Sequence, residues 1–197
     1  MGDGHAFWVE DVLDGLGLQR APLVGLSYGA GLAIRTMGLA PERISRAALV
    51  SPAAIASGPV ARMLFGVALP MLLYRLRPTK EDLLRAARAL LTEPEDPYFG
   101  PAVGELGAVY RHVRLDAGLP RMATEEELEG YGGPVAVFAS EEDAFFPARA
   151  VLPRAREIFP NLVLAESLEA CRHIPSKAGL ARMSECVLAF LAGPDET

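Results

Sequence analysis

The stretch 23–31, Leu-Val-Gly-Leu-Ser-Tyr-Gly-Ala-Gly, limits what this chain can fold into more than any other part of its sequence. An apolar run ends in Gly-x-Ser-x-Gly, and a helical pattern begins directly after it. This order is typical of a strand, a very tight turn that carries a serine, and a helix. Side chains at Gly25 and Gly29 would collide with the neighbouring strand and helix. The motif predicts that the Ser27 hydroxyl stands clear of a sheet, with the Tyr28 N–H at a helix N-terminus where it can stabilise an oxyanion.

The composition indicates a globular protein with one substantial core, or one core and a small lid. Hydrophobic residues make up 51% of the 197 residues, which is enough for a domain of this kind. The net charge is −6 and no basic cluster occurs, which argues against a nucleic-acid or anionic-membrane surface. Seventeen of the 19 basic residues are arginine, as is typical of a GC-rich bacterial genome.

The cysteines and the N-terminus favour a reduced, cytoplasmic setting. Cys171 and Cys186 lack CxxC or ligand-like spacing, so we expect two small buried thiols and no metal. Residues 1–5 show neither the basic nor the apolar region of a signal peptide. The longest uncharged apolar run, 63–74, is too short to cross a bilayer, so no membrane span is expected.

The order of hydrophobic patterns predicts a parallel sheet flanked by helices. In the first expected strand apolar residues do not alternate with polar ones, so both of its faces should be buried. Strand, helix and strand within about thirty residues form a right-handed βαβ unit. The strands are expected at 21–26, 46–51, 134–139 and 161–165, and the helices of this core at 6–16, 29–39, 147–159 and 177–191.

A helical insertion interrupts this pattern after the second strand. Its first helix, expected at 60–76 and broken near Pro70, is apolar on all sides, which suits either a roof over an apolar cleft or ordinary core packing. Further helices are expected at 81–91 and 101–115, and a short one from Thr124. The chain then divides into an N-terminal part of the core (1–52), a helical lid (53–122) and a C-terminal part of the core (123–197).

Three residues in the order serine, acid, histidine point to one chemistry. A serine hydroxyl attacks a carbonyl only with the help of a base, and an imidazole base needs a carboxylate to fix its tautomer and stabilise its charge. Ser27 follows the first expected strand, Asp143 the third and His173 the fourth. Residues 51–52 follow the second strand and offer no acid. Parallel strands bring such loops to the same edge of a sheet.

Each of these choices has an alternative. The acidic loop 141–143 holds three carboxylates, and Asp143 is preferred because it lies nearest to the entry of the following helix. Of the three histidines, His5 lies near the N-terminus and His112 within the helical insertion, so only His173 follows a strand. A plain glycine-rich turn, a solvated loop carboxylate and a surface histidine without a role are the competing interpretations.

These motifs resemble the α/β-hydrolase superfamily, and in particular its lid-bearing serine hydrolases, which include many bacterial esterases. The similar segments are 16–31, 41–44 with 49–52, 142–147 and 172–175. The resemblance departs at Arg172, where the family often has glycine.

The resemblance implies a serine hydrolase without a metal or organic cofactor. In that activity Ser27 is the nucleophile, His173 the base and then the acid, Asp143 the residue that orients it, and the Tyr28 N–H half of the oxyanion hole. The implied substrate is a small carboxylic ester or related acyl compound with an apolar group. A thioesterase, lactonase, C–C hydrolase or acyltransferase would use the same residues.

The family fold has four strands before the elbow strand, whereas one expected helix precedes it here. About 70–100 residues of the family fold are therefore expected to be missing, together with the second oxyanion donor. The result would be an N-terminally truncated fold with the elbow strand as an edge, open to aggregation or partner pairing, such as a homodimer. Two hypotheses follow: an ester hydrolase whose true start lies upstream of Met1, or a non-catalytic remnant that completes its sheet with another chain.

Overall fold

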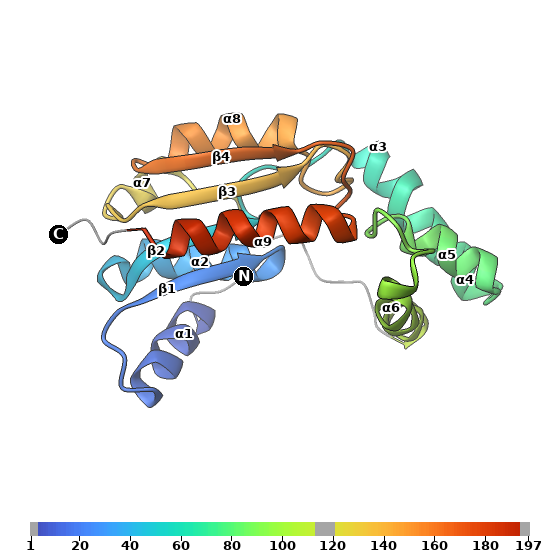
Figure 1. Cartoon of the computed structure of the whole chain (residues 1–197), viewed down its shortest axis with the longest axis horizontal. Helices are drawn as coiled ribbons and strands as arrows, with labels where there is room; N and C mark the ends of the chain where they lie inside the picture. Colours follow the sequence, from blue (N-terminus) through green and yellow to red (C-terminus); the bar gives the residue numbers. More distant parts are fainter. Residues whose placement is uncertain (1–3, 113–120, 194–197) are drawn as a thin grey trace.

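A four-stranded parallel sheet forms the centre of the computed structural model, which describes residues 4–112 and 121–193 (Figure 1). The strand order follows the chain, so that each strand pairs with the next one in the sequence. All four expected strands are confirmed, although the second begins earlier and the fourth ends later than predicted. The strands are β1 (Ala21–Leu26), β2 (Ile44–Val50), β3 (Val135–Ser140) and β4 (Leu162–Leu168).

Helices cover both faces of the sheet, as expected for parallel strands that are apolar throughout. Successive side chains of a strand point to opposite faces, so Ala47 and Leu49 of β2 join one core cluster while Ala48 and Val50 join another. The first cluster lies under α1, α2 and α8, and the second under α9 (Figure 1). These helices are α1 (Gly4–Gly15), α2 (Tyr28–Leu39), α8 (Ala148–Ile158) and α9 (Lys177–Leu191), and a 3-10 turn, η1 (Pro41–Arg43), precedes β2.

Strand β1 is an outer strand with one exposed face. It pairs with β2 alone among the described strands, which confirms that the elbow strand forms an edge. Val24 and Leu26 lie opposite Ala48 and Val50 in the register, yet they are 56% and 50% exposed. The prediction that both faces of this strand are buried is therefore wrong for the described chain. The physical reason is the position of α9, which packs over β2 and β3.

The helical insertion lies beyond the carboxyl ends of the strands (Figure 1). The helix expected at 60–76 runs without a break, but its middle turn is π-helical, and Pro70 lies two residues after this turn. The second helix is shorter than predicted, and residues 113–115 of the third lie outside the described residues. The insertion comprises α3 (Val60–Met63), η2 (Leu64–Ala68), α4 (Leu69–Leu76), α5 (Lys80–Ala87), η3 (Pro97–Phe99) and α6 (Gly100–His112), followed by α7 (Glu125–Leu128).

The long helical run of the insertion is apolar on its packed face and on its exposed face. Val67, Met71 and Tyr74 are buried against the rest of the insertion, so part of its apolar character is ordinary core packing. Other apolar side chains of the run are exposed. They are Val60, Leu64, Phe65, Leu69, Leu72, Leu73 and Leu76. None of the helices in the described parts of the chain has the length and apolarity needed to cross a bilayer.

We expect the chain to self-associate through the outer edge of β1, because its side chains are all apolar while β4, the opposite outer strand, carries Glu166 and Ser167. Val24→Lys should shift the chain toward the monomer in sedimentation velocity. The matched control is Val163→Lys, at an exposed valine of β4, which should leave the association unchanged. An equal effect of both substitutions would contradict pairing through β1.

Candidate active site

Ser27 occupies a strained turn between β1 and α2. Its φ of 53° and ψ of −115° lie in a region that residues with a side chain seldom adopt. Hydrogen bonds of its own main chain hold it there. Its N–H donates to the Val50 carbonyl over 2.9 Å, and its carbonyl accepts N–H groups of Ala30, Gly31 and Ala53. The end of β2 and the first turn of α2 therefore fix the position of the serine.

The two glycines of the motif differ in what surrounds them. A Cβ atom at Gly25 would lie 2.5 Å from Ala30 Cα and 2.7 Å from Ala30 N, so the helix can approach the strand only because this side chain is absent. A Cβ atom at Gly29 would meet nothing within 4 Å. The predicted collision is therefore confirmed at Gly25 and wrong at Gly29, which faces open space among the described residues.

Asp143 and His173 form a buried pair. His173 Nδ1 lies 2.7 Å from Asp143 Oδ2, the aspartate is fully buried, and the histidine is 6% exposed. The second carboxylate oxygen of Asp143 accepts the Phe145 N–H over 2.7 Å. The neighbouring Glu141 and Glu142 are exposed. Of the three carboxylates in this loop, Asp143 is thus the one that contacts the imidazole and can fix its orientation.

Aromatic rings enclose the imidazole of His173. The Phe145 ring lies 5.6 Å from it between centroids, close to an edge-to-face arrangement, and the Phe146 ring lies 5.9 Å away. Both phenylalanines lie within three residues after Asp143, so one short segment supplies the carboxylate and the apolar walls. Such surroundings exclude water and strengthen the interaction between the carboxylate and the imidazole.

The end of β2 links the serine turn to the histidine loop. Val50 accepts the Ser27 N–H, and the next residue, Ser51, donates its hydroxyl to the His173 carbonyl over 2.9 Å. Ser51 is fully buried and has a φ of 43°. From the sequence, this position was notable only because it offers no acid. A serine directly after a buried strand was the available signal for its part in holding the loop.

The remaining residues singled out from the sequence lie in different places. Tyr28 begins α2 beside Ser27, whereas His112 ends α6 in the insertion. Cys171 and Cys186 are free thiols, the first buried and the second half-buried. Across 4–112 and 121–193, no three His, Cys, Asp or Glu side chains are grouped to hold a metal ion.

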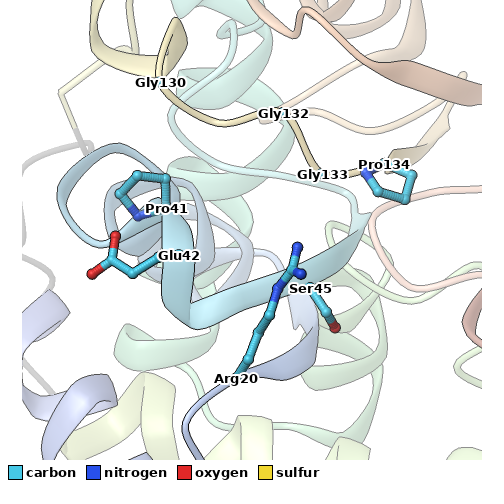
Figure 2. Close-up of a pocket in the computed structure, with 8 residues that line it drawn as sticks. All are labelled: Arg20, Pro41, Glu42, Ser45, Gly130, Gly132, Gly133 and Pro134. Carbon is cyan, nitrogen blue, oxygen red and sulfur yellow. The ribbon is translucent and has the colours of Figure 1, made fainter. Parts of the chain in front are cut away.

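The cavity in Figure 2 lies at the opposite end of the sheet. It has a volume of about 350 Å³ and is lined by Arg20, Glu42, Ser45 and Pro134 among others. Ser45 is near the start of β2, and Pro134 directly precedes β3. Ser27, Asp143 and His173, by contrast, follow the carboxyl ends of their strands. The Figure 2 cavity is therefore separate from the candidate active site.

Comparison with known proteins finds esterases that are similar to this chain. No family model matches the sequence. The chain is 27% identical over 197 residues to the carboxylesterase YbfK of Bacillus subtilis, covering 95% of this chain and 63% of that one. Its fold matches the crystal structure of YbfK with a TM-score of 0.72, at 24% identity and covering 96% of this chain and 66% of that one. The chain therefore has the α/β-hydrolase fold.

Other similar proteins agree with this assignment. A second B. subtilis carboxylesterase, nap, is 25% identical over 187 residues, covering 94% of this chain and 61% of that one. The crystal structure of a B. subtilis naproxen esterase matches with a TM-score of 0.71, at 24% identity, over 94% of this chain and 65% of that one. The chain spans less than two thirds of the length of the two curated relatives.

The turn that carries Ser27 predicts opposite responses at its two glycines. Gly25→Ala should lower the free energy of unfolding by about 1–3 kcal/mol, because its Cβ would overlap the Ala30 backbone. Gly29→Ala, in a helix and facing open space, should change it by less than about 1 kcal/mol and in the stabilising direction. Urea denaturation measures both, and similar losses would contradict the close approach at Gly25.

Proposed function

We propose that the protein hydrolyses a carboxylic ester, or a related acyl compound, through an acyl-enzyme on Ser27. The observation that carries this proposal is the buried Asp143–His173 pair, with Nδ1 and Oδ2 2.7 Å apart. The strained turn that presents Ser27, at the same edge of the sheet, supports it. The similarity to two carboxylesterases supports the class of substrate.

In the proposed reaction His173 acts first as a base and then as an acid. It takes the proton of the Ser27 hydroxyl as the oxygen attacks the substrate carbonyl carbon, and Asp143 stabilises the imidazolium that forms. The Tyr28 N–H donates to the resulting oxyanion. When this intermediate collapses, the alcohol leaves with the proton from His173. Water then attacks the acyl-enzyme by the same steps and releases the acid and Ser27.

The apolar side chains of the insertion support the proposal that the substrate carries an apolar acyl or alcohol group. Its long helical run exposes a series of large apolar side chains, among them Leu64, Phe65 and Leu72, at the end of the sheet where Ser27 and His173 lie. Apolar side chains of this kind favour apolar ligands. We propose the division into core (1–52), lid (53–122) and core (123–197) on the same grounds. The two free thiols support a cytoplasmic setting.

A fluorophosphonate probe tests the nucleophile directly. We expect the wild-type protein to gain one probe mass and Ser27→Ala to gain none, because the probe reacts with an activated serine. The control is Ser184→Ala, at an exposed serine of α9, which should still react. Labelling that persists in Ser27→Ala would contradict the assignment. A wild-type chain that stays unlabelled would favour the alternative of a non-catalytic interaction protein.

Asp143→Asn should lower kcat on a p-nitrophenyl ester by about 10⁴-fold, because an amide favours the wrong imidazole tautomer. The matched control is Glu142→Gln, the exposed neighbour whose carboxylate lies 3.7 Å from Arg172, and its kcat should change less than about twofold. If Glu142→Gln lost activity and Asp143→Asn kept it, the acid would be misassigned. Circular dichroism of both variants shows whether each one folds.

A further inference from the structure

The helical insertion is joined to the histidine loop by backbone hydrogen bonds. Residues 90–92 follow α5, and Leu91 forms an isolated parallel bridge with Ile174. The Ile174 N–H donates to the Leu90 carbonyl over 2.8 Å, and the Thr92 N–H donates to the Ile174 carbonyl over 3.1 Å. A segment of the insertion therefore runs alongside the residue that follows His173.

The hydroxyl of Thr92 contacts the main chain on both sides of His173. Its oxygen accepts the Arg172 N–H over 2.9 Å, and it donates to the Ile174 carbonyl over 2.8 Å. The His173 carbonyl itself accepts the hydroxyl of Ser51 over 2.9 Å. Three consecutive residues of the loop are thus held by two hydroxyl side chains, one from the insertion and one from the end of β2.

The segment that carries Thr92 is itself firmly packed. Leu91 is fully buried in an apolar cluster of the insertion, and Ile174 packs against the same cluster. The Arg172 guanidinium donates to the Arg88 carbonyl, and its Nε lies 3.7 Å from Glu142 in the acid loop. The arginine that departs from the family pattern therefore adds a second link between insertion, histidine loop and acid loop.

We propose that Thr92 is a positioning residue for His173. Its hydroxyl fixes the peptide units before and after the histidine, and this fixes where the imidazole lies against Asp143. A displacement of a catalytic group by about 1 Å costs on the order of 10²-fold in rate. A hydrogen bond that prevents such a displacement of the imidazole therefore raises kcat. This inference rests on the proposed hydrolase function, and it makes the insertion part of the catalytic geometry.

The test compares three substitutions by ester hydrolysis. Thr92→Val removes the hydroxyl and keeps the shape, and we expect kcat to fall about tenfold to a hundredfold with KM nearly unchanged. Thr92→Ser restores the donor and acceptor and should recover most of kcat. The control is Thr79→Val, which removes the hydroxyl that caps α5 in the same insertion and should leave kcat unchanged. A kcat of Thr92→Val equal to wild type, or no rescue by serine, would overturn the proposal.

A second readout does not depend on activity. In NMR spectra of the wild-type protein, the proton of His173 Nδ1 shared with Asp143 should give one downfield signal, and Thr92→Val should broaden or shift it while Thr92→Ser preserves it. The Arg172 amide should also exchange slowly with solvent in the wild type, which tests the contact even if Thr92→Val fails to fold. Fast exchange of this amide would overturn the proposal. Absent hydrolysis with these NMR signals intact would instead count against the proposed function.

Discussion

Parallel pairing of the strands is the constraint on which the candidate site depends. Because every strand runs in the same direction, the segments after β1, β3 and β4 emerge at one edge of the sheet. Ser27, Asp143 and His173 lie on these segments, so the strand direction brings them to the same edge. The end of β2 then connects them, since Val50 accepts from the serine turn and Ser51 donates to the histidine loop. A change in register at β2 would move both contacts together.

Burial makes the Asp143–His173 pair depend on its hydrogen bonds. A carboxylate away from water is stable only when its oxygens are hydrogen-bonded, and here the imidazole and the Phe145 N–H supply both partners. The same short segment places the Phe145 and Phe146 rings against the imidazole. Removing either member would leave an uncompensated buried group, which costs more than the loss of an exposed ion pair.

Features set by local sequence were predictable, and features set by distant neighbours were not. The four strands and the Asp143–His173 contact follow from apolar runs, strand order and the chemistry of three side-chain types. The exposed face of β1 depends on where α9 packs, and the open space at Gly29 depends on what lies around the elbow, neither of which the motif encodes. Thr92 carried no local signal, because it meets the histidine loop 80 residues further along the chain. The roles of Ser27, Asp143 and His173 in a reaction remain predictions.

The parallel bridge between Leu91 and Ile174 bears on how far this protein is modular. A helical insertion is often regarded as a replaceable part that alters which molecules a conserved core admits. Here the insertion is hydrogen-bonded to the loop after β4. Replacing the insertion with that of a relative would therefore remove hydrogen-bond partners of Arg172 and Ile174. Core and insertion are therefore expected to diverge as a matched pair, and a useful graft would have its boundary outside residues 88–92 rather than within them.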